Sequence, residues 1–210
     1  MNKRIIPLLM LLISASLWLI FYQDLPDQVP MQWGLDGSVN WTASKLTALL
    51  TNHGMYIFLY LVLIFSPKLD PKKSNYKQFK RSYEILTYSI LGMFFIINLV
   101  ILFKSLGYPL EINFFVPILV GILFIVIGNY MQTIKTNWFL GIRTPWTLGN
   151  ETVWRKTHRF GSKVFIILGL IFLITPFLPT AWMLPIILVI TFVGSIIPIV
   201  YSYIVYQRIK

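Results

Sequence analysis

The sequence predicts an all-α integral membrane protein built from six transmembrane helices. Hydrophobic residues make up 57% of the 210 positions and charged residues only 12%, whereas soluble domains carry about 25% charged residues. The apolar residues gather in six runs, most of them close to the ~20 residues that a helix needs to cross a bilayer. No Asp, Glu, Lys or Arg lies in the middle of any run, where such a charge costs roughly 2.5–3.5 kcal/mol.

We expect the six spans to form a single polytopic membrane domain over residues 1–210. The first run follows a basic start, as in a signal peptide, but its small residues Ser14, Ala15 and Ser16 lie inside the apolar stretch. A cleavage site would follow that stretch, so we expect an uncleaved helix. The predicted spans are residues 5–21, 46–66, 85–103, 112–131, 164–178 and 182–206.

The distribution of charge predicts how these helices are oriented. Sixteen of the 18 Lys and Arg residues fall on the side of the two termini, and the other side holds only Lys45 and Lys104. The sixteen include Lys3, Arg4 and Lys210. Because basic loops stay in the cytoplasm, both termini are predicted to be cytoplasmic. Orientation also explains the net charge of +11, so we expect no direct contact with nucleic acid.

The connection at residues 24–45 is predicted to be an ordered outer segment. Its Pro and Gly residues indicate extended chain and turns, with a short strand or hairpin around Val29–Trp33. Aromatic and apolar residues stand beside acidic ones here, as a surface for a membrane-active peptide would require; simple anchoring at the bilayer interface is the alternative. The residues concerned are Tyr22, Met31, Trp33 and Trp41, with Asp24, Asp27 and Asp36.

The longest polar run of the second half is residues 139–161, FLGIRTPWTLGNETVWRKTHRFG. Pro145 disfavours helix at the residue before it, so a loop is expected first, and then a helix near residues 150–160. Apolar residues recur there at helical spacing with basic residues off the stripe, which predicts a cytoplasmic interfacial amphipathic helix on anionic lipid. The sharper hypothesis is a docking face for a cytoplasmic partner, formed by Arg143, Trp146, Trp154, His158 and Arg159.

Several classes of function find no support in the residues. The chain has no Cys, and His53 and His158 fall on opposite sides of the predicted membrane. Motifs of zinc peptidases, serine hydrolases and nucleotide-binding loops are absent from the sequence. We therefore expect no enzyme, no metal and no cofactor. Ion-coupled transport is also disfavoured, because it usually needs ionisable groups at mid-membrane.

Two segments carry a resemblance to a known family. GIRTPWTLGNETVWRKTHRFG resembles the signature of the SdpI family of bacterial membrane immunity proteins, and LPDQVPMQWGLDGSVNW resembles a Pro-rich segment near the N-terminus of its longer members. The resemblance covers nearly the whole chain. It implies a multi-pass protein of a Gram-positive cell membrane that protects its producer from a secreted peptide toxin. In some members it also implies relay of a signal, with a small cytoplasmic repressor held at the membrane.

Residue by residue, the resemblance supplies positions without individual roles. On the inner side they are Gly141, Arg143, Thr144, Pro145, Trp146, Thr147, Trp154, His158 and Arg159. On the outer side they are Pro26, Pro30, Gln32, Trp33, Gly37 and Trp41. Two other functions stay open at this point: an exporter of a peptide or lipophilic compound, and a membrane sensor without an immunity role.

Overall fold

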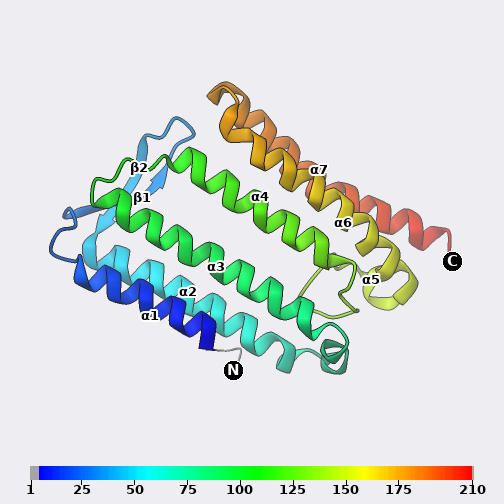
Figure 1. Ribbon diagram of the computed structural model, residues 1–210. Helices are drawn as coiled ribbons and strands as arrows, with labels where there is room; N and C mark the ends of the chain where they lie inside the picture. Colours follow the sequence, from blue (N-terminus) through cyan, green and yellow to red (C-terminus); the bar gives the residue numbers. More distant parts are fainter. Residues whose placement is uncertain (1–4, 210) are drawn as a thin grey trace. The chain divides into compact units, whose positions relative to one another are not determined.

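The computed structural model describes residues 5–209, and these residues are mostly helical (Figure 1). Lys3, Arg4 and Lys210, which entered the orientation count, lie outside the described residues. Five helical segments among those described are long and apolar enough to cross a membrane, and α1 (Ile5–Ile20) is apolar but shorter, at 16 residues. The five are α2 (Lys45–Leu69), α3 (Lys80–Ser105), α4 (Ile112–Met131), α6 (Glu151–Ile174) with η2 (Thr175–Phe177), and α7 (Thr180–Gln207). The chain is thus a multi-pass, α-helical membrane protein.

The prediction of a separate interfacial helix is wrong. The interfacial helix near residues 150–160 is not separate from the fifth span, because α6 runs without a break from Glu151 to Ile174. Gly161 and Ser162 lie at the expected junction, yet both are buried inside this helix. A Cβ at Gly161 would lie 2.6 Å from Ile142 Cδ1 and 2.9 Å from Met131 Sδ. The composition of residues 151–174 suggests two segments, but the residues around Gly161 are closely packed within one continuous helix.

The chain divides into two compact units, which are described separately. The first comprises residues 5–63 and 88–116 and contains a two-stranded antiparallel sheet, β1 (Gln28–Trp33) and β2 (Val39–Ser44). The hairpin expected around Val29–Trp33 is confirmed. Val29 on β1 and Ala43 on β2 face each other, and both are buried. They join a hydrophobic cluster completed by Trp18, Leu25, Ala48, Ile101 and Leu102.

The second unit comprises residues 64–87 and 117–209. In it α4 and α6 pack so closely that only glycine fits at Gly121 and Gly169, where a Cβ on either residue would lie 2.7–2.8 Å from the carbonyl oxygen of the other. Small residues at such contacts let helix backbones approach in a membrane, where burial of apolar surface drives no association. Leu168 and Phe172 of α6 form a hydrophobic cluster with Ile190 of α7, against which Phe124 of α4 also packs. This packing supports the polar loop between α4 and α6.

Candidate functional site

The candidate site is the loop that joins α4 to α6, together with the first turns of α6. His158 lies on α6 and is fully buried. Its Nε2 accepts a hydrogen bond from the Ile142 backbone N–H at 3.1 Å, and its Nδ1 donates to the Trp154 carbonyl at 2.8 Å. An acceptor on one nitrogen and a donor on the other require the neutral ring. His158 therefore fixes the loop to the helix and offers no exposed group.

Gly141 leaves the space that the His158 ring occupies. Its φ is +107°, in the region that L side chains rarely adopt. A Cβ at this position would also overlap the His158 Nε2 atom. The glycine is thus required by both its backbone conformation and the space left by the imidazole.

The next turn is built by the two threonines. Thr144 caps the short helix α5 (Pro145–Gly149) by accepting a bond from the Thr147 N–H at 3.2 Å, while the Thr147 Oγ1 accepts from the Thr144 N–H at 2.8 Å. This reciprocal pair is a capping box, and Pro145 suits the first helical position because its missing N–H would be unpaired there. The Thr147 hydroxyl also bonds the Ile142 carbonyl at 3.0 Å. Both backbone groups of Ile142 are therefore held by side chains of the motif.

Trp146 connects this turn to the last helix. Its indole N–H donates to the Ser202 Oγ at 2.7 Å. The ring also lies against Tyr203 and Tyr206, with centroids 5.4 and 6.2 Å away. Trp146 therefore attaches the turn to the end of α7.

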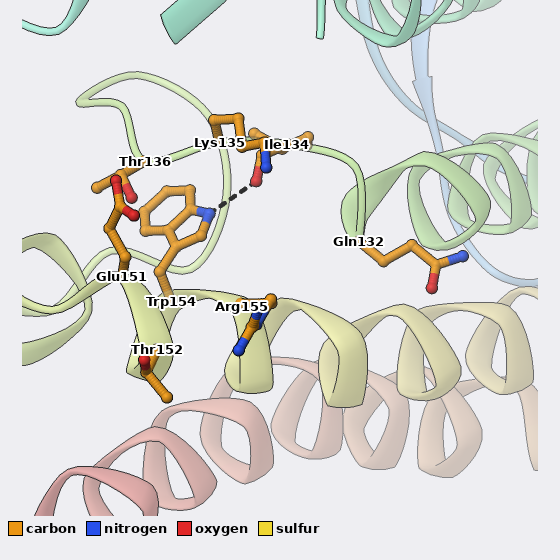
Figure 2. Close-up of a pocket in the computed structure, with 8 residues that line it drawn as sticks. All are labelled: Gln132, Ile134, Lys135, Thr136, Glu151, Thr152, Trp154 and Arg155. Carbon is orange, nitrogen blue, oxygen red and sulfur yellow. Dashed lines mark hydrogen bonds between the residues drawn. The ribbon is translucent and has the colours of Figure 1, made fainter. Parts of the chain in front are cut away.

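Trp154 attaches the start of α6 to the beginning of the loop. It is buried, lies flat against His158 with ring centroids 3.9 Å apart, and donates its indole N–H to the Ile134 carbonyl at 2.7 Å. Figure 2 shows this bond at the wall of a small polar pocket of about 190 Å³. Its lining residues are Gln132, Ile134, Lys135, Thr136, Glu151, Thr152, Trp154 and Arg155. The pocket is lined by side chains of both charge signs together with Ile134 and Trp154.

A network of buried polar side chains closes the loop on the segment after α2. Asp70 is buried and accepts three bonds, from the Lys72 N–H (2.7 Å), the Trp138 N–H (2.8 Å) and the Tyr76 hydroxyl (2.9 Å). Asn137 is also fully buried, and its Oδ1 accepts from the Leu140 N–H at 2.7 Å. Burial, and then the bond to Asp70, raise the pKa of the Tyr76 phenol. The loop is therefore rigidly held before any partner binds.

The five residues of the predicted docking face do not share one exposed surface. Trp154 and His158 are buried, Trp146 is partly buried, and Arg143 and Arg159 are exposed. Arg143 donates a hydrogen bond to the Trp138 carbonyl. Only the two arginines are exposed, and part of the Arg143 guanidinium is already bound to the Trp138 carbonyl. The aromatic residues of the motif act in packing.

The outer residues all lie on or next to the hairpin of the first unit. Gly37 adopts a φ of +82° at its turn, and the adjoining loop is held by the Asn113 Nδ2 bond to the Leu35 carbonyl at 2.6 Å. Trp33 is partly buried against the hydrophobic cluster, whereas Trp41 is half exposed. Two hydrogen bonds from Ser38 lower the pKa of the exposed Asp36 carboxyl. Pro26 and Gln32 are exposed and Pro30 is partly buried.

The sequence is similar to that of a known immunity protein and matches two family models. The chain is 31% identical over 210 residues to the immunity protein SdpI of Bacillus subtilis, covering 100% of this chain and 99% of the relative. The model of the SdpI/YfhL protein family matches residues 133–202. The chain belongs to the SdpI/YfhL family. A second family model, a domain of unknown function (DUF1648), matches residues 9–53. No solved structure matches the chain significantly.

The two matches fall on the two candidate surfaces of this SdpI/YfhL protein. Residues 133–202 cover the loop, α5, α6 and most of α7, and residues 9–53 cover most of α1, the hairpin and the start of α2. Within residues 5–209, no group of three His, Cys, Asp or Glu side chains is placed to hold a metal ion. Asp70, Tyr76 and Asn137 were not predicted from the sequence, because nothing local marks Asp70 and Tyr76 as partners of residues 137 and 138, more than sixty positions away.

Proposed function

We propose that this SdpI/YfhL protein is a membrane immunity protein that protects its producer cell from a secreted, membrane-active peptide toxin. The observation that carries the proposal is the full-length identity of 31% to the immunity protein SdpI of Bacillus subtilis. Two features support it. The hairpin exposes an aromatic surface, and the motif loop is rigid enough to transmit a change in the helices attached to it.

The proposal includes an orientation. If α1 crosses the membrane as a sixth span, the hairpin follows one crossing and the motif loop follows four, so the two lie on opposite faces. The basic residues around the loop favour a cytoplasmic location for it, and the proposed topology puts both termini on the same side. The hairpin faces the outside, where a secreted toxin arrives.

Recognition of the toxin is assigned to the hairpin. Trp41 and Gln32 face each other across the two strands, and both are exposed. Acidic Asp24 and Asp36 are exposed close by in the sequence. An exposed tryptophan on a segment that also exposes carboxylates suits an apolar, cationic peptide, because aromatic anchors contribute much of the binding energy of an interface.

The test is survival of a toxin-sensitive Bacillus-like host that expresses this chain alone and meets an SDP-type peptide. Protection is the expected result, and Trp41→Ala should weaken it at equal amounts of protein in the membrane. Trp182→Ala is the matched control, since Trp182 is an exposed tryptophan at the start of α7. Loss of protection in both variants, or in neither, would overturn the assignment of the hairpin. No protection by the unaltered chain would overturn immunity to this toxin class.

Relay of the signal is assigned to the motif loop. Arg143 on the loop and Arg159 on α6 are two of the exposed cations of the motif and would contact a small cytoplasmic repressor. In the native host, Arg143→Ala and Arg159→Ala should abolish toxin-dependent induction of a reporter for the protein's own operon, while Lys77→Ala, an exposed control, should not. Unchanged induction in both arginine variants would exclude this surface. Toxin transport into inverted vesicles that depends on a proton gradient would instead favour the exporter.

A further inference from the structure

An open pocket of about 570 Å³ lies between the start of α6 and the end of α7. Four of its lining residues are cations: Lys156, Arg159 and Lys163 on α6, and Arg208 directly after α7. All four are exposed. Lys156 and Arg159 belong to the 139–161 motif, whereas Lys163 and Arg208 lie outside it. Neither immunity nor relay requires four cations at this pocket.

The pocket is a consequence of helical spacing. Lys156 lies three and four residues before Arg159 and Phe160, and Lys163 lies four and three residues after them, so the four residues share one face of α6. Tyr201, Ile204, Val205 and Arg208 repeat the pattern at the end of α7. The two faces meet where Phe160 stacks on Tyr201, with ring centroids 4.1 Å apart and planes at 17°.

The positive charge of this pocket has no acidic partner within the part of the chain that the structure describes. Among residues 5–209, no carboxylate forms an ion pair with any of the four cations. The only acid on α6 is Glu151, at its first position, and it lines the separate pocket of Figure 2. Four like charges around one cavity repel one another, and an anion placed among them relieves that repulsion.

An apolar groove of about 260 Å³ continues from the basic pocket along α7. Phe160, Tyr201 and Ile204 line both cavities, so the two are contiguous. The groove is completed by Ile196, Ile197 and Val200. No Asp, Glu, Lys or Arg occurs in α7, nor in α6 after Lys163. The basic pocket therefore marks the polar boundary of the spans, and the groove enters their apolar part.

We propose that this SdpI/YfhL protein holds one anionic phospholipid here. The headgroup phosphate lies among Lys156, Arg159, Lys163 and Arg208, and one acyl chain follows the groove beyond the Phe160–Tyr201 stack. A soluble phosphate would use the basic pocket alone, and a bulk lipid chain would use the groove alone. Only a lipid with an anionic headgroup uses both. The inference does not depend on toxin immunity, because it rests on these two helices and their charges, but it shares Arg159 with the surface proposed above for relay.

The experiment is titration of the full-length protein, purified in a mild non-ionic detergent, with phosphatidylglycerol and with phosphatidylcholine, followed by native mass spectrometry. We expect tighter binding of the anionic lipid. The double variant Arg159→Gln/Lys163→Gln should weaken its binding about 25-fold, since each cation near anionic lipid is worth about fivefold in affinity. The control Lys73→Gln/Lys77→Gln removes the same charge from two exposed lysines outside the pocket and should leave binding unchanged.

The groove is tested by filling it. Val200→Trp should block the acyl chain and weaken phosphatidylglycerol binding, whereas Leu188→Trp, at an exposed position of α7 that lines neither cavity, should not. Equal binding of the two lipids, or equal loss in the pocket and control double variants, would overturn the proposal. So would glycerol phosphate competing as well as the whole lipid, because that result leaves no role for the groove.

Discussion

Gly141→Ala tests the central claim that the motif loop is closed on His158. Alanine would have to adopt the φ of +107° that glycine occupies. Its methyl group would also overlap the Nε2 atom of His158, which accepts the Ile142 N–H. The imidazole is fully buried on α6 and cannot move aside without losing its two hydrogen bonds.

The magnitude follows from these two costs. A left-handed backbone costs an L residue roughly 1–2 kcal/mol. Displacing the ring leaves the partly buried Ile142 N–H without its acceptor, which costs about 1–3 kcal/mol. The free energy of unfolding should therefore fall by about 2–5 kcal/mol.

The measurement is unfolding of the purified full-length chain in mixed detergent, followed by tryptophan fluorescence. Gly149→Ala is the matched control, because it stands in open space at the end of α5 without a positive φ, and it should change stability by less than about 0.5 kcal/mol. His158→Ala provides a second test. With the ring removed, Gly141→Ala should cost only the backbone term of about 1–2 kcal/mol. The same cost in both backgrounds would refute the proposed closure.

Three further predictions concern the loop and the hairpin. Trp146→Phe keeps the ring on α7 but loses the bond to Ser202, so the free energy of unfolding should fall by about 0.5–1.5 kcal/mol in the same assay. Because burial raises the pKa of Tyr76 above its unfolded value of about 10, its contribution to stability is present below pH ~10 and lost above it; Tyr76→Phe should reduce this alkaline loss in unfolding curves across pH. Trp33→Ala should destabilise the purified protein, whereas Trp41→Ala should leave its unfolding unchanged, because only Trp33 packs on the cluster. An equal effect of the two tryptophans would contradict this difference.

The helical membrane character and the hairpin could be predicted because their signals are local. Apolar runs mark α2, α3, α4 and α7 within a few residues of their observed ends. The largest difference is at α3, which begins at Lys80, before the span predicted for residues 85–103. Polar residues can continue a helix beyond its apolar run, so hydrophobicity alone does not locate the end of the helix. Pro and Gly marked the hairpin, since both restrict the backbone directly.

The prediction of a separate interfacial helix failed for a physical reason. Over residues 151–161, apolar residues recur at helical spacing and basic residues fall on the other face, as they do in helices that lie on a bilayer. The same pattern also suits the end of a spanning helix whose apolar stripe packs on a loop. Val153, Trp154 and Thr157 are all buried in this way. Periodicity shows that one face is covered, but it does not distinguish lipid from protein as the cover.

The sequence by itself determined the class of protein, the segments that cross or line the membrane, and the motif that marks the family. Those properties depend on hydrophobicity, backbone restriction and residue order, which are carried by each residue with its neighbours. Only the tertiary structure decided that His158 fits the space at Gly141, that Asp70 and Asn137 close the loop, and that four cations meet an apolar groove between α6 and α7. Hydrogen bonds and cavities depend on distances between remote residues, and these exist only once the helices have packed.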